Sequence, residues 1–194
     1  IGTNSLNKNV TGINNIAIGI NALYSNTTGY NNIATGYQAL YSNVEGNLLG
    51  GGFNNIATGY QALYSNTGGV NNISFGYQTL FNNSNGYNNI ANGNQALYSN
   101  TNGNDNIANG EKSLFSNTTG TDNIANGYQA LYSNTTGANN VANGRNSLYY
   151  NTSGNNNSAI GSYSLNKNIT GNNNIANRLM ALFSNTSGDN NIAY

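Results

Sequence analysis

Two aspartates stand at the same place in successive repeats of the sequence, and they are the pair best suited to acid–base chemistry. Asp105 and Asp122 are 17 residues apart. If one repeat forms one coil, their carboxylates lie about 5 Å apart, which is the separation found in a retaining glycosidase. Asn fills the same slot in the other repeats, and no neighbouring residue type points to a pocket around the pair. We therefore assign no catalytic residue and predict that the chain is not an enzyme.

The residue types that are missing exclude most other chemistry. The 194 residues contain no His and no Cys, and only 5% of them are charged, with five cationic and five acidic residues. This composition excludes an imidazole base, a thiol nucleophile and a Cys/His metal site, and we expect neither a metal nor a cofactor. It also lacks the basic surface that nucleic acid or an anionic membrane would need. Because no run of about 18 apolar residues occurs, we predict no membrane span.

A stripe of tyrosines and glutamines is the best candidate for a binding surface. Tyr37, Tyr60, Tyr77 and Tyr128 occupy one slot of the repeat. The glutamines of the next slot are Gln38, Gln61, Gln78, Gln95 and Gln129. A flat stripe of this kind could stack on the sugar rings of a surface glycan or contact a neighbouring copy. The alternative is that the side chains form aromatic and amide ladders that only stabilise the sheet.

One insertion interrupts the repeat and offers a second possible contact. The spacing between Leu40 and Leu63 is 23 residues instead of 17, so six residues are inserted, best placed at 46–51. Leu48 and Leu49 lie in this Gly-rich segment and could form an exposed contact point or pack against the rest of the molecule. Loops on rigid scaffolds often carry function, whereas a merely tolerated insertion is the commoner outcome.

The elements that position these residues follow from the repeat, which reads N-N-I-A-x-G-x-x-A-L-Y-S-N-T-T-G-x. Two of its columns are Asn in every repeat and one is Leu. The first Asn column begins Asn15, Asn32 and Asn55, the second includes Asn26, Asn43 and Asn66, and the Leu column includes Leu23, Leu40 and Leu63. An aromatic column follows the Leu and interchanges Tyr with Phe, which indicates packing by the ring. Its members are Tyr24, Tyr41, Tyr64, Phe81, Tyr98, Phe115, Tyr132, Tyr149 and Phe183.

Each repeat carries two short apolar stretches, such as 15–18 and 22–24, bounded by Gly or by Asn-Thr-Thr-Gly. Such stretches suit strands and are too short for helices. We predict an all-β parallel β-solenoid (a β-roll) of about eleven 17-residue coils with two short strands per coil, forming one domain over 1–194. Identical residues then stack about 4.8 Å apart, so the Asn columns become hydrogen-bonded ladders. Each coil is expected to bury one Ile, one Leu and one aromatic residue.

The repeat resembles two known groups of surface proteins. Segments such as Ala17-Ile18-Gly19, after paired Asn, are similar to the repeats of trimeric autotransporter adhesin heads. The fuller unit at 123–137 is similar to repeats of bacteriophage tail-fibre-like proteins, which often precede a chaperone-of-endosialidase domain. The resemblance implies a parallel β-roll, trimeric, on the outside of a cell or virion. The 17-residue unit is longer than the usual adhesin-head repeat.

These observations predict a structural protein. We expect an extracellular fibre segment, at a cell or virion surface, that is either an adhesin or tail-fibre shaft or a head-to-tail filament subunit. The chain without its insertion starts and stops at the same phase of the 17-residue unit, which favours stacking of copies end to end. The partner is then the chain itself, as a trimer or a filament. The alternative function is a carbohydrate-binding module that uses the tyrosine–glutamine stripe.

Overall fold

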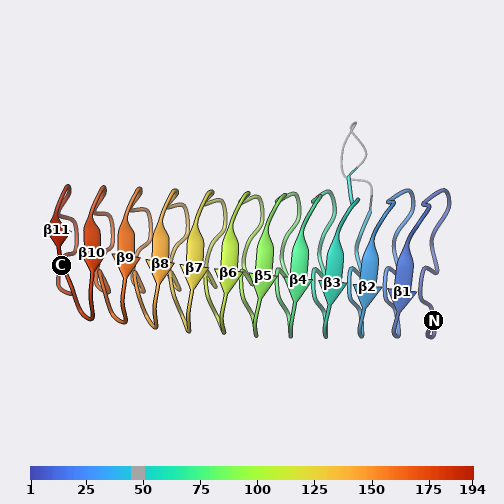
Figure 1. Cartoon of the computed structure of the whole chain (residues 1–194). Coiled ribbons are helices and arrows are strands. Elements are labelled where there is room, and N and C mark those ends of the chain that lie inside the picture. The colour runs from blue at the N-terminus through green and yellow to red at the C-terminus, as the bar shows by residue number, and fades with distance from the viewer. Residues whose placement is uncertain (45–50) are drawn as a thin grey trace.

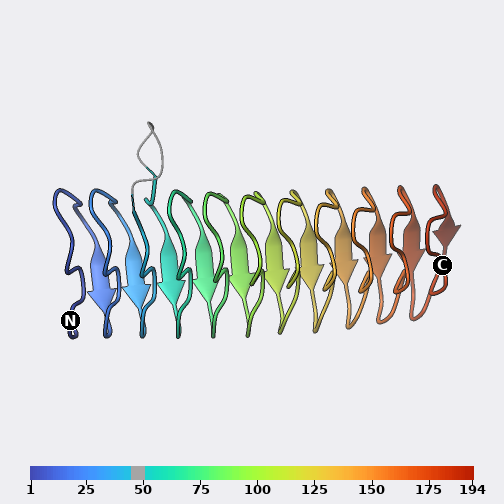
Figure 2. The same cartoon turned by 180° about the vertical axis from the view of Figure 1, so that it is seen from behind.

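Short parallel strands stack side by side in chain order along the whole chain (Figures 1 and 2). The computed structural model describes residues 1–44 and 51–194. Its sheet has eleven strands in the order of the sequence. The strands are β1 (Ile16–Ile18), β2 (Ile33–Thr35), β3 (Ile56–Thr58), β4 (Ile73–Phe75), β5 (Ile90–Asn92), β6 (Ile107–Asn109), β7 (Ile124–Asn126), β8 (Val141–Asn143), β9 (Ser158–Ile160), β10 (Ile175–Asn177) and β11 (Ile192–Ala193).

The register places equivalent residues of the repeat against each other. Ile16 pairs with Ile33 and Ala17 pairs with Ala34, and the same pairing continues from coil to coil. The register is also kept across the insertion, because β2 pairs with β3 through Ile33 and Ile56. The prediction of a parallel β-solenoid with 17-residue coils is therefore confirmed. In the part of the chain that is described, no helix is long and apolar enough to cross a membrane.

Each coil contains one strand, so the expectation of two strands per coil is wrong. The second apolar stretch, residues 22–24 in the first complete coil, forms turns. Asn21 and Leu23 have φ values of 56° and 49°, which belong to the left-handed region and not to a strand. The backbone still bonds to the next coil, since the Leu23 N–H donates to the Ala39 carbonyl at 2.9 Å. These left-handed residues turn the chain sharply and return it to the sheet.

The interior contains fewer columns of apolar side chains than the sequence suggested. The Leu column and the Ala column of the strands are buried, as Leu97 and Ala91 illustrate, except at the ends of the chain, where Leu6 and Leu182 are partly buried. The Ile column, expected inside, faces outward instead: Ile16 is 50% exposed and Ile90 is 37% exposed. Side chains of a strand alternate between its two faces, so placing the Asn and Ala of N-N-I-A inside puts the Ile outside. The aromatic column directly follows the Leu column in the repeat, and its side chains are half-buried.

The glycine that follows each of the strands β1 to β9 is required by its geometry, whereas Arg178 follows β10. Gly110 has a φ of 139°, and a Cβ placed there would lie 2.5 Å from the carbonyl oxygen of Gly127 in the next coil. An L-residue would meet both backbone strain and a clash with backbone atoms. The column therefore combines a positive φ with a close approach of two backbones, and glycine meets both requirements.

Candidate functional site

Both predicted asparagine ladders are present, and they run inside the solenoid. In the first ladder the Asn32 Nδ2 donates to Asn15 Oδ1 at 3.1 Å and to the Gly52 carbonyl at 2.7 Å, and the Asn32 backbone N–H also donates to Asn15 Oδ1. The next coil repeats this backbone contact from Asn55 to Asn32 at 3.0 Å. Each amide thus fastens its own coil to the preceding one and also closes a turn.

The second ladder is built in the same way and crosses the insertion. Asn43 donates to Asn26 Oδ1 at 2.7 Å, and Asn66 donates to Asn43 Oδ1 at 2.9 Å. These side chains are buried. The Leu column, with Leu23, Leu40 and Leu63, lies fully buried as predicted. The interior is therefore a stack of amides and aliphatic groups that satisfies its own polar atoms.

The tyrosine–glutamine stripe consists of ladders whose ring faces are covered. Tyr37 stacks on Tyr60 at a centroid distance of 5.3 Å, and Tyr60 stacks on Tyr77 at 5.2 Å. The glutamines form an amide ladder, for example from Gln61 Nε2 to Gln38 Oε1 at 2.8 Å. Sugar rings stack on free aromatic faces, whereas the faces between stacked rings are already occupied. The stripe presents ring edges and is a poor surface for sugar stacking.

Tyr128 does not join the other three tyrosines. Asn94 and Glu111 occupy the same slot in the coils between Tyr77 and Tyr128. The guanidinium of Arg145, in the following coil, lies 5.4 Å from the Tyr128 ring centroid. A cation–π contact therefore covers a face of this ring as well.

The aspartate pair has a structural explanation. Asp105 and Asp122 are exposed and both have a φ of 57°. Asn and Asp are the non-glycine residues that best tolerate this left-handed conformation, which explains why the slot holds only these two residue types. Asp105 accepts a hydrogen bond from Asn88 Nδ2 at 2.9 Å, as the Asn side chains of this slot do elsewhere. No group of three His, Cys, Asp or Glu that could hold a metal occurs among the described residues.

The aromatic column is an almost continuous stack of rings. From Tyr24 to Tyr149 the neighbouring centroids are 5.0–5.2 Å apart and the planes are within 8° of parallel. Burial raises the pKa of Tyr64 and of Tyr149 above the usual tyrosine value, and the adjacent phenols, Tyr41 and Tyr132 respectively, raise them further. The ring stack therefore favours the neutral form of the phenol.

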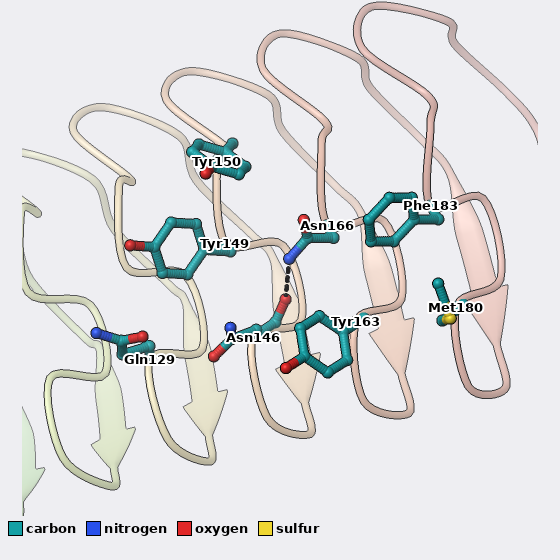
Figure 3. A pocket seen from close by; sticks show the side chains of 8 residues that line it. All are labelled: Gln129, Asn146, Tyr149, Tyr150, Tyr163, Asn166, Met180 and Phe183. Atoms are coloured by element: carbon teal, nitrogen blue, oxygen red, sulfur yellow. Dashed lines mark hydrogen bonds between the residues drawn. The ribbon is translucent and has the colours of Figure 1, made fainter.

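The stack is interrupted at Asn166, and a cavity of about 440 Å³ opens there (Figure 3). The cavity is lined by Gln129, Asn146, Tyr149, Tyr150, Tyr163, Asn166, Met180 and Phe183. Sequence reasoning missed this site. The signal was available, since Asn166 is a polar residue between Tyr149 and Phe183 in a column of rings.

The predicted contact at Leu48 and Leu49 lies outside the described residues. The coil on either side of it closes normally, because Asn43 Nδ2 donates to the Gly52 carbonyl at 2.8 Å where Asn26 Nδ2 donates to Gly29 at 3.1 Å. Gly52 thus takes the place that Gly29 has one coil earlier, after six additional residues.

Comparison with known proteins does not add to this geometry. The chain matches no family model, no curated protein and no solved structure.

Proposed function

We propose that this chain is a structural segment of an extracellular fibre, of the kind that forms the shaft of an adhesin or a tail fibre. The observation that carries the proposal is the continuity of the two buried Asn ladders, which bond each coil to the preceding one even across the insertion. A repeat array of this kind contacts only its neighbouring coils, so its length grows with the number of repeats. The function is reach and display, and the ladders supply the stiffness.

The composition supports the same proposal. Identical residues stack about one strand spacing apart, so a charge repeated in every coil would repel its own copies along the whole rod. The unit is neutral, and only Asp105 and Asp122 place like charges in the same slot of successive coils. Such a sequence suits a long stack and does not provide the cluster of titratable groups that a hydrolase requires.

The partner that we propose is a second copy of the chain, packed on the outer face of the sheet. The first outward column of the strands is Ile in nine of eleven coils, with Val141 and Ser158 in the others. The second outward column, Ile18 to Asn177, contains no charged residue. Two copies share one coil spacing, so the outward side chains of one can lie between the rows of outward side chains of the other.

The size of the face is compatible with this partner. Eleven strands about 4.8 Å apart and three residues wide at about 3.3 Å each give roughly 500 Å² of flat area per copy. A standard interface buries about 800 Å² of accessible surface per partner, and the accessible area of protruding Ile side chains exceeds the flat area. A face of this size supports association into a dimer or trimer of parallel rods.

Electron microscopy and sedimentation of the purified chain test the proposal. We expect stiff rods of constant width about 50 Å long, or fibres that are multiples of this length. Sedimentation should show more than one chain per particle. Flexible or globular particles would contradict the structural role, and a strictly monomeric rod would remove only the proposed partner.

Glycan binding by the tyrosine–glutamine stripe remains the alternative. A glycan array probed with the wild-type chain and with Tyr60→Ala tests it directly. Since the Tyr60 faces are covered by Tyr37 and Tyr77, we expect no glycan signal that depends on Tyr60.

A further inference from the structure

The cavity at Asn166 is the place of a missing ring in the aromatic column. Every coil from Tyr24 to Tyr149 places a Tyr or Phe in this column, and Phe183 occupies it again after the gap. Asn166 is turned inward, is only 6% exposed and donates its Nδ2 to the Asn146 carbonyl at 2.8 Å (Figure 3). We call this gap the vacant rung.

The vacant rung is one ring high along the rod, within the larger cavity of about 440 Å³. Tyr149 and Phe183 are two coils apart, so their rings are separated by about twice the strand spacing, roughly 10 Å. One six-membered ring fits between two others at this separation, as Tyr98 does between Phe81 and Phe115. Lys167 Nζ lies 5.2 Å from the centroid of the Phe183 ring, so a ligand ring takes this place when the Lys167 side chain moves aside. Tyr149 is held in place by an edge-on contact with Tyr150 at 4.7 Å.

We propose that the vacant rung binds one flat aromatic ring that carries a hydrogen-bonding substituent. The ring of such a ligand stacks on the face of Tyr149 that points toward the next coil and replaces the contact that Asn166 does not make. This inference is independent of the fibre proposal and adds a small-molecule or side-chain site to it.

The polar groups around the rung suit a substituent such as a hydroxyl. The amides of Gln129, Asn146 and Asn166 line the cavity, and a binding site of this kind combines apolar walls with a few convergent polar groups. The Oδ1 of Asn146 is buried and has no hydrogen-bond partner. This amide gains a hydrogen bond when its side chain turns toward a donor in the cavity, so a phenol is favoured over an unsubstituted ring.

Charge next to the rung favours an anionic ligand over a cationic one. The charged residues that adjoin the lining residues in sequence are Arg145 and Lys167, and both are cations. Lys167 Nζ lies 5.2 Å from the centroid of the Phe183 ring, so it reaches over that ring from the preceding coil. The same Leu-Asn-Lys-Asn sequence occurs at 6–9. There Lys8 covers Tyr24 in the first coil, where no second ring completes a slot.

The chain offers a single reporter for the experiment. Met180 is the only methionine in the sequence and lines the cavity. Labelling the methionine methyl group with ¹³C therefore gives one NMR resonance at the site. Titration with p-cresol should shift this resonance with a dissociation constant on the order of 1 mM, as expected for a ligand of this size. Contacts from the ligand ring to the Tyr149 ring should appear in the same sample.

Two variants test the missing ring itself. Asn166→Tyr restores the column and should weaken p-cresol binding at least tenfold, because the inserted ring occupies the slot. Tyr98→Asn should create a second vacant rung between Phe81 and Phe115 and raise the stoichiometry from one p-cresol to two. If Asn166→Tyr does not fold, the Met180 shift and the contacts to Tyr149 in the wild-type chain still decide the question.

Related ligands test the chemistry. 4-Hydroxyphenylacetate should bind several-fold more tightly than tyramine, since the two share a phenol and differ in the sign of the charge. Unchanged p-cresol binding by Asn166→Tyr, or no shift of Met180 at 20-fold the expected dissociation constant, would overturn the proposal. Binding of methyl β-D-glucopyranoside without binding of p-cresol would also overturn it and would assign the rung to a sugar ring.

Discussion

At the scale of single residues, the buried Asn side chains hold the solenoid together because each amide makes several bonds at once. Asn100 donates to Asn83 Oδ1 at 2.8 Å and to the Gly103 carbonyl at 2.9 Å, and it accepts from Asn117 Nδ2 at 2.8 Å. Asn100→Ala removes all three bonds and leaves the buried Asn83 Oδ1 without its donor, whereas Asn117 Nδ2 keeps its bond to the Gly120 carbonyl and the Gly103 carbonyl keeps its bond from Asn89. We expect the free energy of unfolding, measured by urea titration, to fall by about 3 kcal/mol.

An exposed Asn pair provides the matched control for this variant. Asn109 Nδ2 donates to Asn126 Oδ1 at 3.0 Å on the surface of the same region. Water replaces this bond, so Asn109→Ala should change the free energy of unfolding by less than about 0.5 kcal/mol. An equal effect of the two substitutions would show that burial of the ladder is not what makes it stabilising.

The glycine after each strand gives a second prediction for a single residue. Gly110→Ala places a methyl group 2.5 Å from the Gly127 carbonyl oxygen at a φ of 139°. We expect a loss of about 3 kcal/mol or more in urea unfolding. The control is Gly68→Ala, since Thr28 and Thr119 occupy the slot of Gly68 in other coils. Gly68→Ala should leave stability nearly unchanged, and a similar loss in both variants would contradict the assignment.

Single columns were the part of the molecule that the sequence predicted best. The invariant Asn positions pointed to hydrogen-bonded ladders, because a side-chain amide can donate to and accept from the same amide one coil away. The left-handed conformation of Leu23, with a φ of 49°, could not be predicted, since an isolated Leu has no preference for it. It is imposed by the closure of the coil. Asn166 was visible in the sequence, but the cavity depends on its inward rotamer.

At the scale of elements, the sequence analysis predicted the wrong face of the strands to be buried. A stretch of four residues such as 15–18 does not fix which alternate set is buried, and a shift of one residue exchanges the two faces. Hydrophobicity alone favours burying Ile16. The choice is made by Asn15, whose amide reaches the Gly29 carbonyl at 2.7 Å only when Ile16 points outward. The prediction of a strand at the second apolar stretch, 22–24, was wrong for a related reason. The chain has to turn there so that the Leu23 side chain points into the interior of the coil.

The aromatic column predicts a loss of stability at high pH. Burial raises the pKa of Tyr64 and Tyr149 in the folded state, so the folded chain holds these protons more tightly than the unfolded chain does. Their contribution to stability is fully present below the unfolded tyrosine pKa, near 10, and is lost as the pH rises through the higher folded values. Thermal unfolding followed by circular dichroism should show a falling midpoint above about pH 10.

The double variant Tyr64→Phe/Tyr149→Phe separates this effect from general alkaline damage. Phe81 and Phe115 already occupy the column, so the rings should stack as before. We expect a melting midpoint close to that of wild type at pH 7 and a smaller decrease above pH 10. If wild type and variant lost stability in parallel, the buried phenols would not be responsible.

At the scale of the whole molecule, the exposed Ile column connects the fold to the proposed assembly. A contiguous apolar stripe on a neutral sheet face is a feature of interaction surfaces. The inward Asn and Ala columns already fill the strand side of the interior, so the Ile side chains are not needed there. Their presence in nine of eleven strands is therefore better explained by a surface that packs against an identical surface.

This reasoning predicts that Ile90→Lys leaves the fold intact and weakens self-association. Ile90 is 37% exposed and projects from the sheet face, so a lysine there keeps its ammonium in water in the single rod. In an assembly of two copies the charge would be buried between the sheets without a partner, and we expect at least tenfold weaker association by sedimentation equilibrium. The control is Asn102→Lys, which adds the same charge at an exposed position outside the strands. An unfolded Ile90→Lys chain would show that the Ile column belongs to the interior, and unchanged association would place the interface on another face of the rod.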